Sequence, residues 1–200
     1  MTDVDLKDTL EAVFDQVLEI SLRWKVFRQL FDSGEENIVL LNNSGSFVFG
    51  LVQRLLLYDA VISLSRLTDG EKSCGQENAS IKNLFVKAKK KLSPEDIEKI
   101  ERSLCELEGY TRSIRNHRNK TLAHADLKRA TGRHTFQEIT YDELELSMKS
   151  IQEIVIILGK TAGVQINHYE TIIPFGCDGS YLLKILRKAH EDAEVTNDLL

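Results

Sequence analysis

The chain has 200 residues and a mass of 22.8 kDa, which is the size of one domain, or of one domain with a tail. An apolar content of 42% excludes a disordered chain, and 2 Pro and 11 Gly are too few for the tight turns of a sandwich or barrel. The net charge of −5 excludes a protein whose whole surface attracts nucleic acid.

Positive charge is concentrated in the middle of the chain. Residues 82–133 hold 14 Lys and Arg but 7 Asp and Glu, a net charge of +7, so the remaining residues carry −12. A basic centre on an acidic body is typical of a local anion-binding site, and it is also typical of one solvated helix face. The sequence leaves both interpretations open.

The first predicted element is an amphipathic helix over residues 4–32. Apolar residues recur there at steps of three and four, which is the spacing of one buried helix face. The sequence Asp32-Ser33-Gly34 is expected to end this helix, and a polar loop is expected to run to about Ser44.

The next segment, residues 46–69, is apolar almost all round. Arg54, Asp59 and Arg66 make it a costly membrane span, so we expect no membrane contact and a helix enclosed on all sides within a bundle. Buried charges are tolerated when they are paired. Asp59 and Arg66 are seven residues apart and share a face, so they either brace the core or point at a site.

Two helices are predicted in the basic centre. Ser80 is placed to cap a short basic helix over residues 81–92. A stronger start signal follows, because Ser93 is a good N-cap, Pro94 suits the first helical position and Asp96 stands where a capping box has an acid. This third long helix is expected to end near residue 125.

One more long helix completes the predicted core. Thr140 or Asp142 is expected to begin it, and Gly159 or Gly163 to end it. Residues 164–177 are predicted to be extended and residues 181–193 to form a short helix. The sequence therefore predicts an all-α protein, an antiparallel four-helix bundle over residues 1–160 with a C-terminal extension over residues 161–200.

The cysteines give no support for a metal centre. Cys74, Cys105 and Cys177 form no CxxC pair, so neither a zinc site nor a redox dithiol is expected. We expect no metal and no cofactor, and we expect Cys105, which lies in a helical pattern, to be a small core residue. The odd number of cysteines and the acidic N-terminal residues favour a cytoplasmic protein.

Chemically useful side chains gather between residues 112 and 126. Two rows of helical positions face inward: 100, 107 and 114 continue to 121, and 97, 104 and 111 continue to Arg118. An apolar environment is expensive for an arginine. Such a placement implies an ion-pair partner, a subunit interface or a ligand. On an unbroken helix His124 lies ~9 Å beyond Arg118 and about 120° around, so the two converge if the helix ends between them or a dimer joins two copies.

This stretch resembles the HEPN superfamily (higher eukaryote and prokaryote nucleotide-binding domains). The hallmark of these helical bundles is an arginine, a polar residue, several more residues and a histidine, which here reads RNKTLAH with Arg118, Asn119 and His124. The upstream sequence SLSRLTD (residues 63–69) makes the chain similar to the AbiU-like branch of abortive-infection proteins. The resemblance covers roughly residues 5–160.

The resemblance implies a metal-independent endoribonuclease, or an inactive relative that binds RNA, nucleotides or a protein. In the enzyme, His124 is the general base, since histidine titrates near neutrality, and Arg118 clamps the phosphate with bidentate donors. Asn119 orients the phosphate or the histidine. Attraction to the RNA backbone is assigned to Arg115, His117 and Lys120.

The same resemblance implies partners. Family members generally form homodimers through the motif face, which pools two Arg–His pairs, and an antitoxin or a nucleotidyltransferase is a possible partner of a toxin or phage-defence protein. Some members carry a tyrosine two residues after the histidine, which the nucleotidyltransferase modifies. Asp126 stands there in this chain, which puts that modification in doubt, and Asp126 is instead placed to orient His124.

A purely structural interpretation stands beside the catalytic one. Arg118, Asn119 and His124 can pin the end of a helix, where positive charge is favourable in itself. Arg118 and Asp59 can form a buried brace, with Arg66 in the same supporting role.

Overall fold

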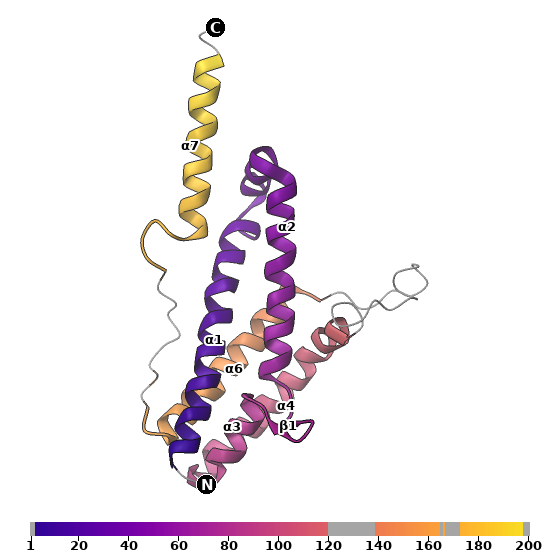
Figure 1. Ribbon diagram of the computed structural model, residues 1–200, viewed down its shortest axis with the longest axis vertical. Helices are drawn as coiled ribbons and strands as arrows, with labels where there is room; N and C mark the ends of the chain where they lie inside the picture. The colour runs from indigo at the N-terminus through magenta and orange to yellow at the C-terminus, as the bar shows by residue number, and fades with distance from the viewer. Residues whose placement is uncertain (1–2, 120–138, 165, 167–172, 198–200) are drawn as a thin grey trace, which may run out of the picture. The chain divides into compact units, whose positions relative to one another are not determined.

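The computed structural model describes residues 3–119, 139–164, 166 and 173–197. Within these residues the chain is helical apart from one short β-hairpin, which confirms the all-α class (Figure 1). The elements, in chain order, are α1 (Asp3–Phe31), α2 (Glu35–Leu67), β1 (Lys72–Ser73), β2 (Gln76–Glu77), α3 (Ile81–Ala88), the 3-10 turn η1 (Lys89–Lys91), α4 (Pro94–His117), α6 (Tyr141–Thr161) and α7 (Gly179–Asn197).

The four long predicted helices correspond to α1, α2, α4 and α6. Their antiparallel four-helix arrangement stays a prediction. The chain divides into two compact units, which we call the motif unit (Met1–Ile20 and Ala60–Tyr169) and the hairpin unit (Ser21–Asp59 and Glu170–Leu200). Helices α1 and α2 contribute to both units. The predicted boundary between residues 160 and 161 stays a prediction.

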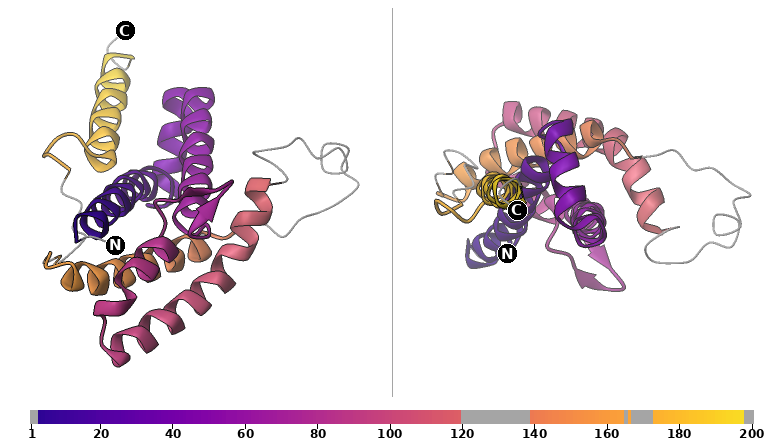
Figure 2. Two further views of the ribbon diagram at one scale, coloured as in Figure 1. Left: turned by 60° about the horizontal axis from the view of Figure 1, so that its bottom comes forward. Right: turned by 90° about the horizontal axis from the view of Figure 1, so that it is seen from above.

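The core of the motif unit is built on α4 and α6, which lie side by side, with α3 packed on α6 (Figure 2). Both long helices bury apolar residues at a spacing of seven, and each of these residues is at most 2% exposed: Ile100, Leu107 and Ile114 on α4, and Leu144, Ile151 and Leu158 on α6. This spacing keeps one stripe of each helix against the other. The periodicity read from the sequence therefore identified the inner face of α4.

Helix ends are set by side chains that the sequence predicts as caps. Ser80, Ser93 and Thr140 each accept the backbone N–H three residues on, at 3.3, 3.1 and 3.2 Å. The carboxylate of Glu143 accepts the N–H of Thr140 at 3.0 Å, which completes a capping box and makes Thr140 the start of α6. Gly163, at φ 76°, ends α6 in a Schellman motif.

Helix α2 differs from its prediction in two ways. It begins at Glu35, so the loop predicted up to Ser44 is wrong; Glu35 and Glu36 suit the positive end of a helix dipole, and the helical geometry is interrupted only at Gly45. The predicted enclosure on all sides is also wrong, since Phe47 is 77% exposed. Helix α2 is long and apolar enough to cross a membrane. Core helices of soluble proteins and signal sequences share this length and composition, so one such helix is weak evidence for a membrane span.

The prediction for Cys105 is also wrong, because this thiol is exposed. Cys105 follows the buried Ile100 by five residues, which is about 140° around the helix, so it lies well away from the inner stripe of α4. A helical pattern alone does not bury a residue. Its phase relative to the buried stripe decides.

A buried lysine ties three elements of the motif unit together. The side chain of Lys87 on α3 is 6% exposed, and its Nζ lies 2.6 Å from Asp5 of α1 and 2.7 Å from Glu77 of β2. Burial by itself lowers the pKa of Lys87, but the hydrogen bonds and charges of the two carboxylates outweigh it and leave the pKa raised. The hydrogen bond from Lys87 lowers the pKa of Glu77.

We expect Lys87→Gln to lower the free energy of unfolding at pH 7 by about 1–3 kcal/mol, the loss typical of hydrogen bonds to a charged group. A raised lysine pKa stabilises below its ordinary value of 10.5 and loses this effect as pH rises through the folded pKa. The lowered pKa of Glu77 stabilises above its ordinary value of 4.5 and loses this effect as pH falls. The difference between wild type and variant should therefore shrink in strong acid.

Urea denaturation at several pH values measures this difference. Lys99→Gln is the control, because its pair with Glu95 is exposed and should contribute little to stability. A loss for Lys87→Gln that is the same at pH 3 and pH 7 would show that the carboxylates are not its source.

Candidate functional site

The candidate site lies at the C-terminal end of α4, where the predicted Arg-to-His motif begins. Beyond His117 the chain continues through Arg118 and Asn119 as a π-helical turn. The N–H of Arg118 is shared between the carbonyls of Ile114 and Arg115. Such local widening of a helix is frequent at functional sites, because it re-aims the side chains that follow it.

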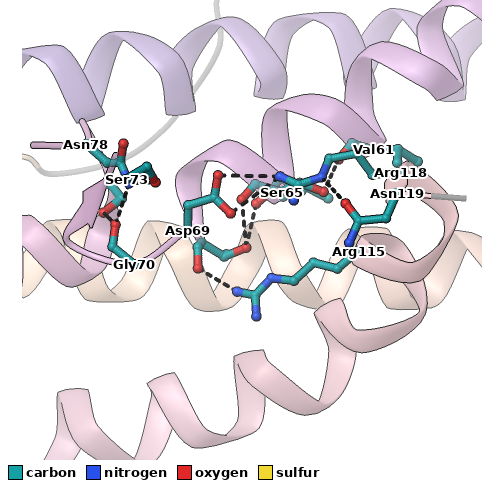
Figure 3. A network of polar contacts seen from close by, with 12 residues as sticks. Val61, Ser65, Asp69, Gly70, Ser73, Asn78, Arg115, Arg118 and Asn119 are labelled. Carbon is teal, nitrogen blue, oxygen red and sulfur yellow. Dashed lines mark hydrogen bonds and ion pairs between the residues drawn. The ribbon is translucent and has the colours of Figure 1, made fainter. Parts of the chain in front are cut away.

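The side chain of Arg118 reaches the residue that follows α2 by two positions. Its Nη1 lies 3.4 Å from both carboxylate oxygens of Asp69, and its Nε donates to Oδ1 of Asn119 at 3.0 Å (Figure 3). The side chains of Arg118 and Asp69 are 27% and 34% exposed. The ion-pair partner that the helical phase of Arg118 implied is therefore Asp69.

The Nη2 group of the Arg118 guanidinium has no acceptor among the described residues, although Nη1 and Nε are both engaged. Arginine carries five N–H donors in a fixed fork, so a guanidinium held through Nε and Nη1 still presents the N–H groups of Nη2 to an incoming phosphate or carboxylate. The pair with Asp69 thus orients Arg118 without using all of its donors.

Asp69 is itself held by the turn that ends α2. The hydroxyls of Ser65 and Thr68 donate back to the carbonyls four residues earlier, at 2.7 and 2.8 Å, and both residues are buried. After Asp69 the amide of Asn78 donates to the carbonyl of Gly70 at 2.8 Å (Figure 3). The sequence SLSRLTD therefore builds a fixed turn that presents a carboxylate to α4.

Arg115 joins the same turn from α4. Its Nη2 donates to the carbonyl of Thr68, the residue directly after α2, where a cation is favourable to the helix dipole (Figure 3). Its Nε is buried without a hydrogen-bond partner among the described residues. Arg115 thus caps α2, and its predicted role in RNA binding stays a prediction.

The other predicted residues are placed as follows. Asp59 pairs with Arg23 at 3.0 and 3.1 Å, so the alternative brace between Asp59 and Arg118 is wrong. Asp59 precedes Asp69 by ten residues, about 15 Å along a helix, and Arg118 contacts the latter. Arg66 is exposed, Asn119 is exposed and His117 is half-buried.

The second half of the Arg-to-His motif, which contains His124, is not among the residues whose positions are described above. Lys120, His124 and Asp126 lie outside the described residues, as does the predicted helix end near residue 125. Among the described residues, no group of three or more His, Cys, Asp or Glu side chains is arranged to hold a metal ion. Sequence reasoning missed Asp69, although this residue closes the SLSRLTD segment on which the resemblance rests.

Comparison with known proteins gives one match. The family model HEPN_AbiU2, described as AbiU2, matches residues 3–174, a range that contains both SLSRLTD and the Arg118–His124 motif. Neither the curated proteins nor the solved structures include a match to the chain.

Proposed function

The chain belongs to the AbiU2 family of HEPN proteins, and from this premise we propose that it is a metal-independent endoribonuclease of the abortive-infection type. The observation that carries the proposal is the geometry of Arg118, which Asp69 and Asn119 orient while no residue of the described part of the chain accepts from its Nη2. A pre-oriented guanidinium is what a crowded phosphate in a transition state requires. RNA is the proposed substrate.

The proposed reaction uses the substrate's own nucleophile. His124 takes the proton of a ribose 2′-hydroxyl, the 2′-oxygen attacks the adjacent phosphorus, and the bond from phosphorus to the 5′-oxygen breaks. The leaving 5′-oxygen gains a proton, so the products are a 2′,3′-cyclic phosphate and a 5′-hydroxyl. Arg118 stabilises the charge on the phosphate oxygens. Neither a protein nucleophile nor a metal ion is needed for these steps.

We assign the remaining predicted residues to binding and assembly. Asn119 orients the phosphate, while Arg115, His117 and Lys120 attract the RNA backbone, and Asp126 orients His124. A homodimer pools two Arg–His pairs, so that one histidine serves as base and the other protonates the leaving group. We place the protein in the cytoplasm, as a toxin or phage-defence protein with an antitoxin or nucleotidyltransferase as its partner.

A second candidate is a binding module without turnover. The observation that favours it is the same ion pair, because Asp69 already compensates the charge of Arg118. Incubation of the purified protein with RNA and with DNA of the same sequence separates the two. The enzyme cleaves RNA and spares DNA, which lacks the 2′-hydroxyl, whereas the module retains RNA without producing fragments.

Asp69 is proposed as a positioning residue for Arg118. We expect Asp69→Asn to lower kcat by about 10-fold or more with a smaller change in KM. A misplaced Arg118 stabilises the transition state less well, whereas the positive charge with which it attracts RNA is unchanged. Asp69→Glu should restore part of kcat. The measurement is steady-state cleavage of a short RNA.

Glu71→Gln is the matched control, because this neighbouring carboxylate is exposed and has no side-chain contact with Arg118. A rise in KM with an unchanged kcat would contradict the positioning role, as would equal kcat values for Asp69→Asn and Asp69→Glu.

A further inference from the structure

One face of α2 within the hairpin unit is apolar and uncovered. Val48, Leu51, Leu55 and Tyr58, which we call the α2 stripe, are 58%, 41%, 56% and 39% exposed. Their spacing of three, four and three residues places them on one side of the helix. The same spacing continues along α2 at Ile62, which is 39% exposed.

The side of α2 next to the stripe is already occupied in this unit. Asp59 pairs with Arg23 of α1, and Leu56 lines an apolar pocket with Leu22 and Val26 of the same helix. The α2 stripe is therefore the side that α1 leaves open. Single exposed apolar residues are ordinary, but four in succession at the spacing of a coiled-coil seam are an interaction surface.

We propose that the α2 stripe packs against the α2 stripe of a second copy of this chain, with the two helices parallel. Seven-residue spacing is the pattern by which one helix seam receives the side chains of another. Arg54 and Asp59 lie within the same stretch and are costly in a bilayer.

The charges beside the stripe select the parallel arrangement. With Val48 and Leu55 in the first core position of each heptad (a) and Leu51 and Tyr58 in the second (d), Arg54 takes a g position and Asp59 an e position. In a parallel pair, g contacts the e position five residues on, so Arg54 meets the partner's Asp59. An antiparallel pair places like charges opposite one another.

Both side chains can make this contact. Arg54 is exposed, and no hydrogen bond joins its side chain to a described residue. The carboxylate of Asp59 is 35% exposed beside Arg23, and a carboxylate has lone pairs for a second guanidinium. The β-branched Val48 and the γ-branched Leu51 also stand where two-stranded parallel coiled coils place such residues.

The inference rests on the proposed function in one respect, since it gives the proposed homodimer a second surface besides the motif face. The test of this inference does not depend on RNA cleavage. In a full-length chain with Cys74, Cys105 and Cys177 changed to Ser, Leu51→Cys places one thiol at a d position. In a parallel dimer the two d positions face each other at disulfide distance, so mild oxidation should link most of the protein into dimers.

Val39→Cys in the same background is the matched control, because Val39 is 52% exposed on the same helix but outside the stripe. We expect little linkage there. Equal linkage at both positions would overturn the proposal, because it would reflect random collision.

Light scattering of the wild-type chain at tens of micromolar completes the test. A dimer in which Leu51→Cys does not link overturns the α2 stripe and leaves the proposed homodimer standing, while a monomer overturns both. Flotation of monomeric protein with lipid vesicles would assign the stripe to a membrane instead.

A second variant checks the apolar contribution. Leu51→Glu with Leu55→Glu should raise the dimer dissociation constant by at least about 100-fold, since central apolar residues carry most of the binding energy of an interface. Val39→Glu should leave it within a few-fold, and circular dichroism should show the same helix content for all three chains. An unchanged dissociation constant in the double variant contradicts the proposal.

Discussion

His124→Ala should lower the single-turnover rate of RNA cleavage by at least ~100-fold, the usual contribution of one general base. The substitution removes the group that accepts the 2′-hydroxyl proton, and nothing else in the proposed reaction replaces it. RNA affinity should change little, because a neutral histidine adds no permanent charge. Cleavage of a labelled oligoribonucleotide measures the rate, and retention of the same oligomer on the protein measures the affinity.

His190→Ala is the matched control for this substitution. His190 lies in the hairpin unit, where its Nε2 is 3.0 Å from Oγ of Ser44, and it has no assigned part in the reaction. We expect the cleavage rate of this variant to stay within a few-fold of wild type. Rates that fall equally in both variants would point to a loss of folding rather than a loss of a base.

Arg118→Ala should lower the cleavage rate by at least ~100-fold and should also weaken RNA binding, which separates it from His124→Ala. The variant removes the donors that Asp69 and Asn119 hold in place, together with a permanent charge. Arg118→Lys should restore most of the binding but little of the rate, because an ammonium keeps the charge and loses the planar fork.

Arg112→Ala provides the comparison, since Arg112 is exposed on the same helix and contacts neither Asp69 nor Asn119. It should leave the rate within a few-fold of wild type. A full rate in Arg118→Lys would show that a point charge is sufficient, and the bidentate clamp would then be wrong.

The rules of helix capping and of helical periodicity predicted the starts of α4 and α6 and the buried face of α4. Ser93 and Thr140 cap their helices because a hydroxyl three residues before a backbone N–H satisfies it, and no tertiary contact is needed for that. The seven-residue spacing of Ile100, Leu107 and Ile114 likewise identified the inner face of α4. The neighbouring row of positions 97, 104 and 111 continues to Arg118 and so required a counter-charge for it.

The sequence could not select the counter-charge. Asp59 and Asp69 both lie on or just beyond the same apolar helix, and only the packing of α4 against the end of α2 decides that Asp69 meets Arg118. The same limit applies to α2 itself. An apolar helix was expected to be buried within one chain, but periodicity does not say whether the burying surface belongs to that chain.

The measurement that tests the account most directly is the identity of the RNA ends produced in excess EDTA, determined by mass spectrometry of one defined oligoribonucleotide. The account predicts a 2′,3′-cyclic phosphate and a 5′-hydroxyl at each cut, absent from reactions of His124→Ala and Arg118→Ala. Ends with a 3′-hydroxyl and a 5′-phosphate, cleavage that requires magnesium, or cleavage that persists in both variants would contradict it.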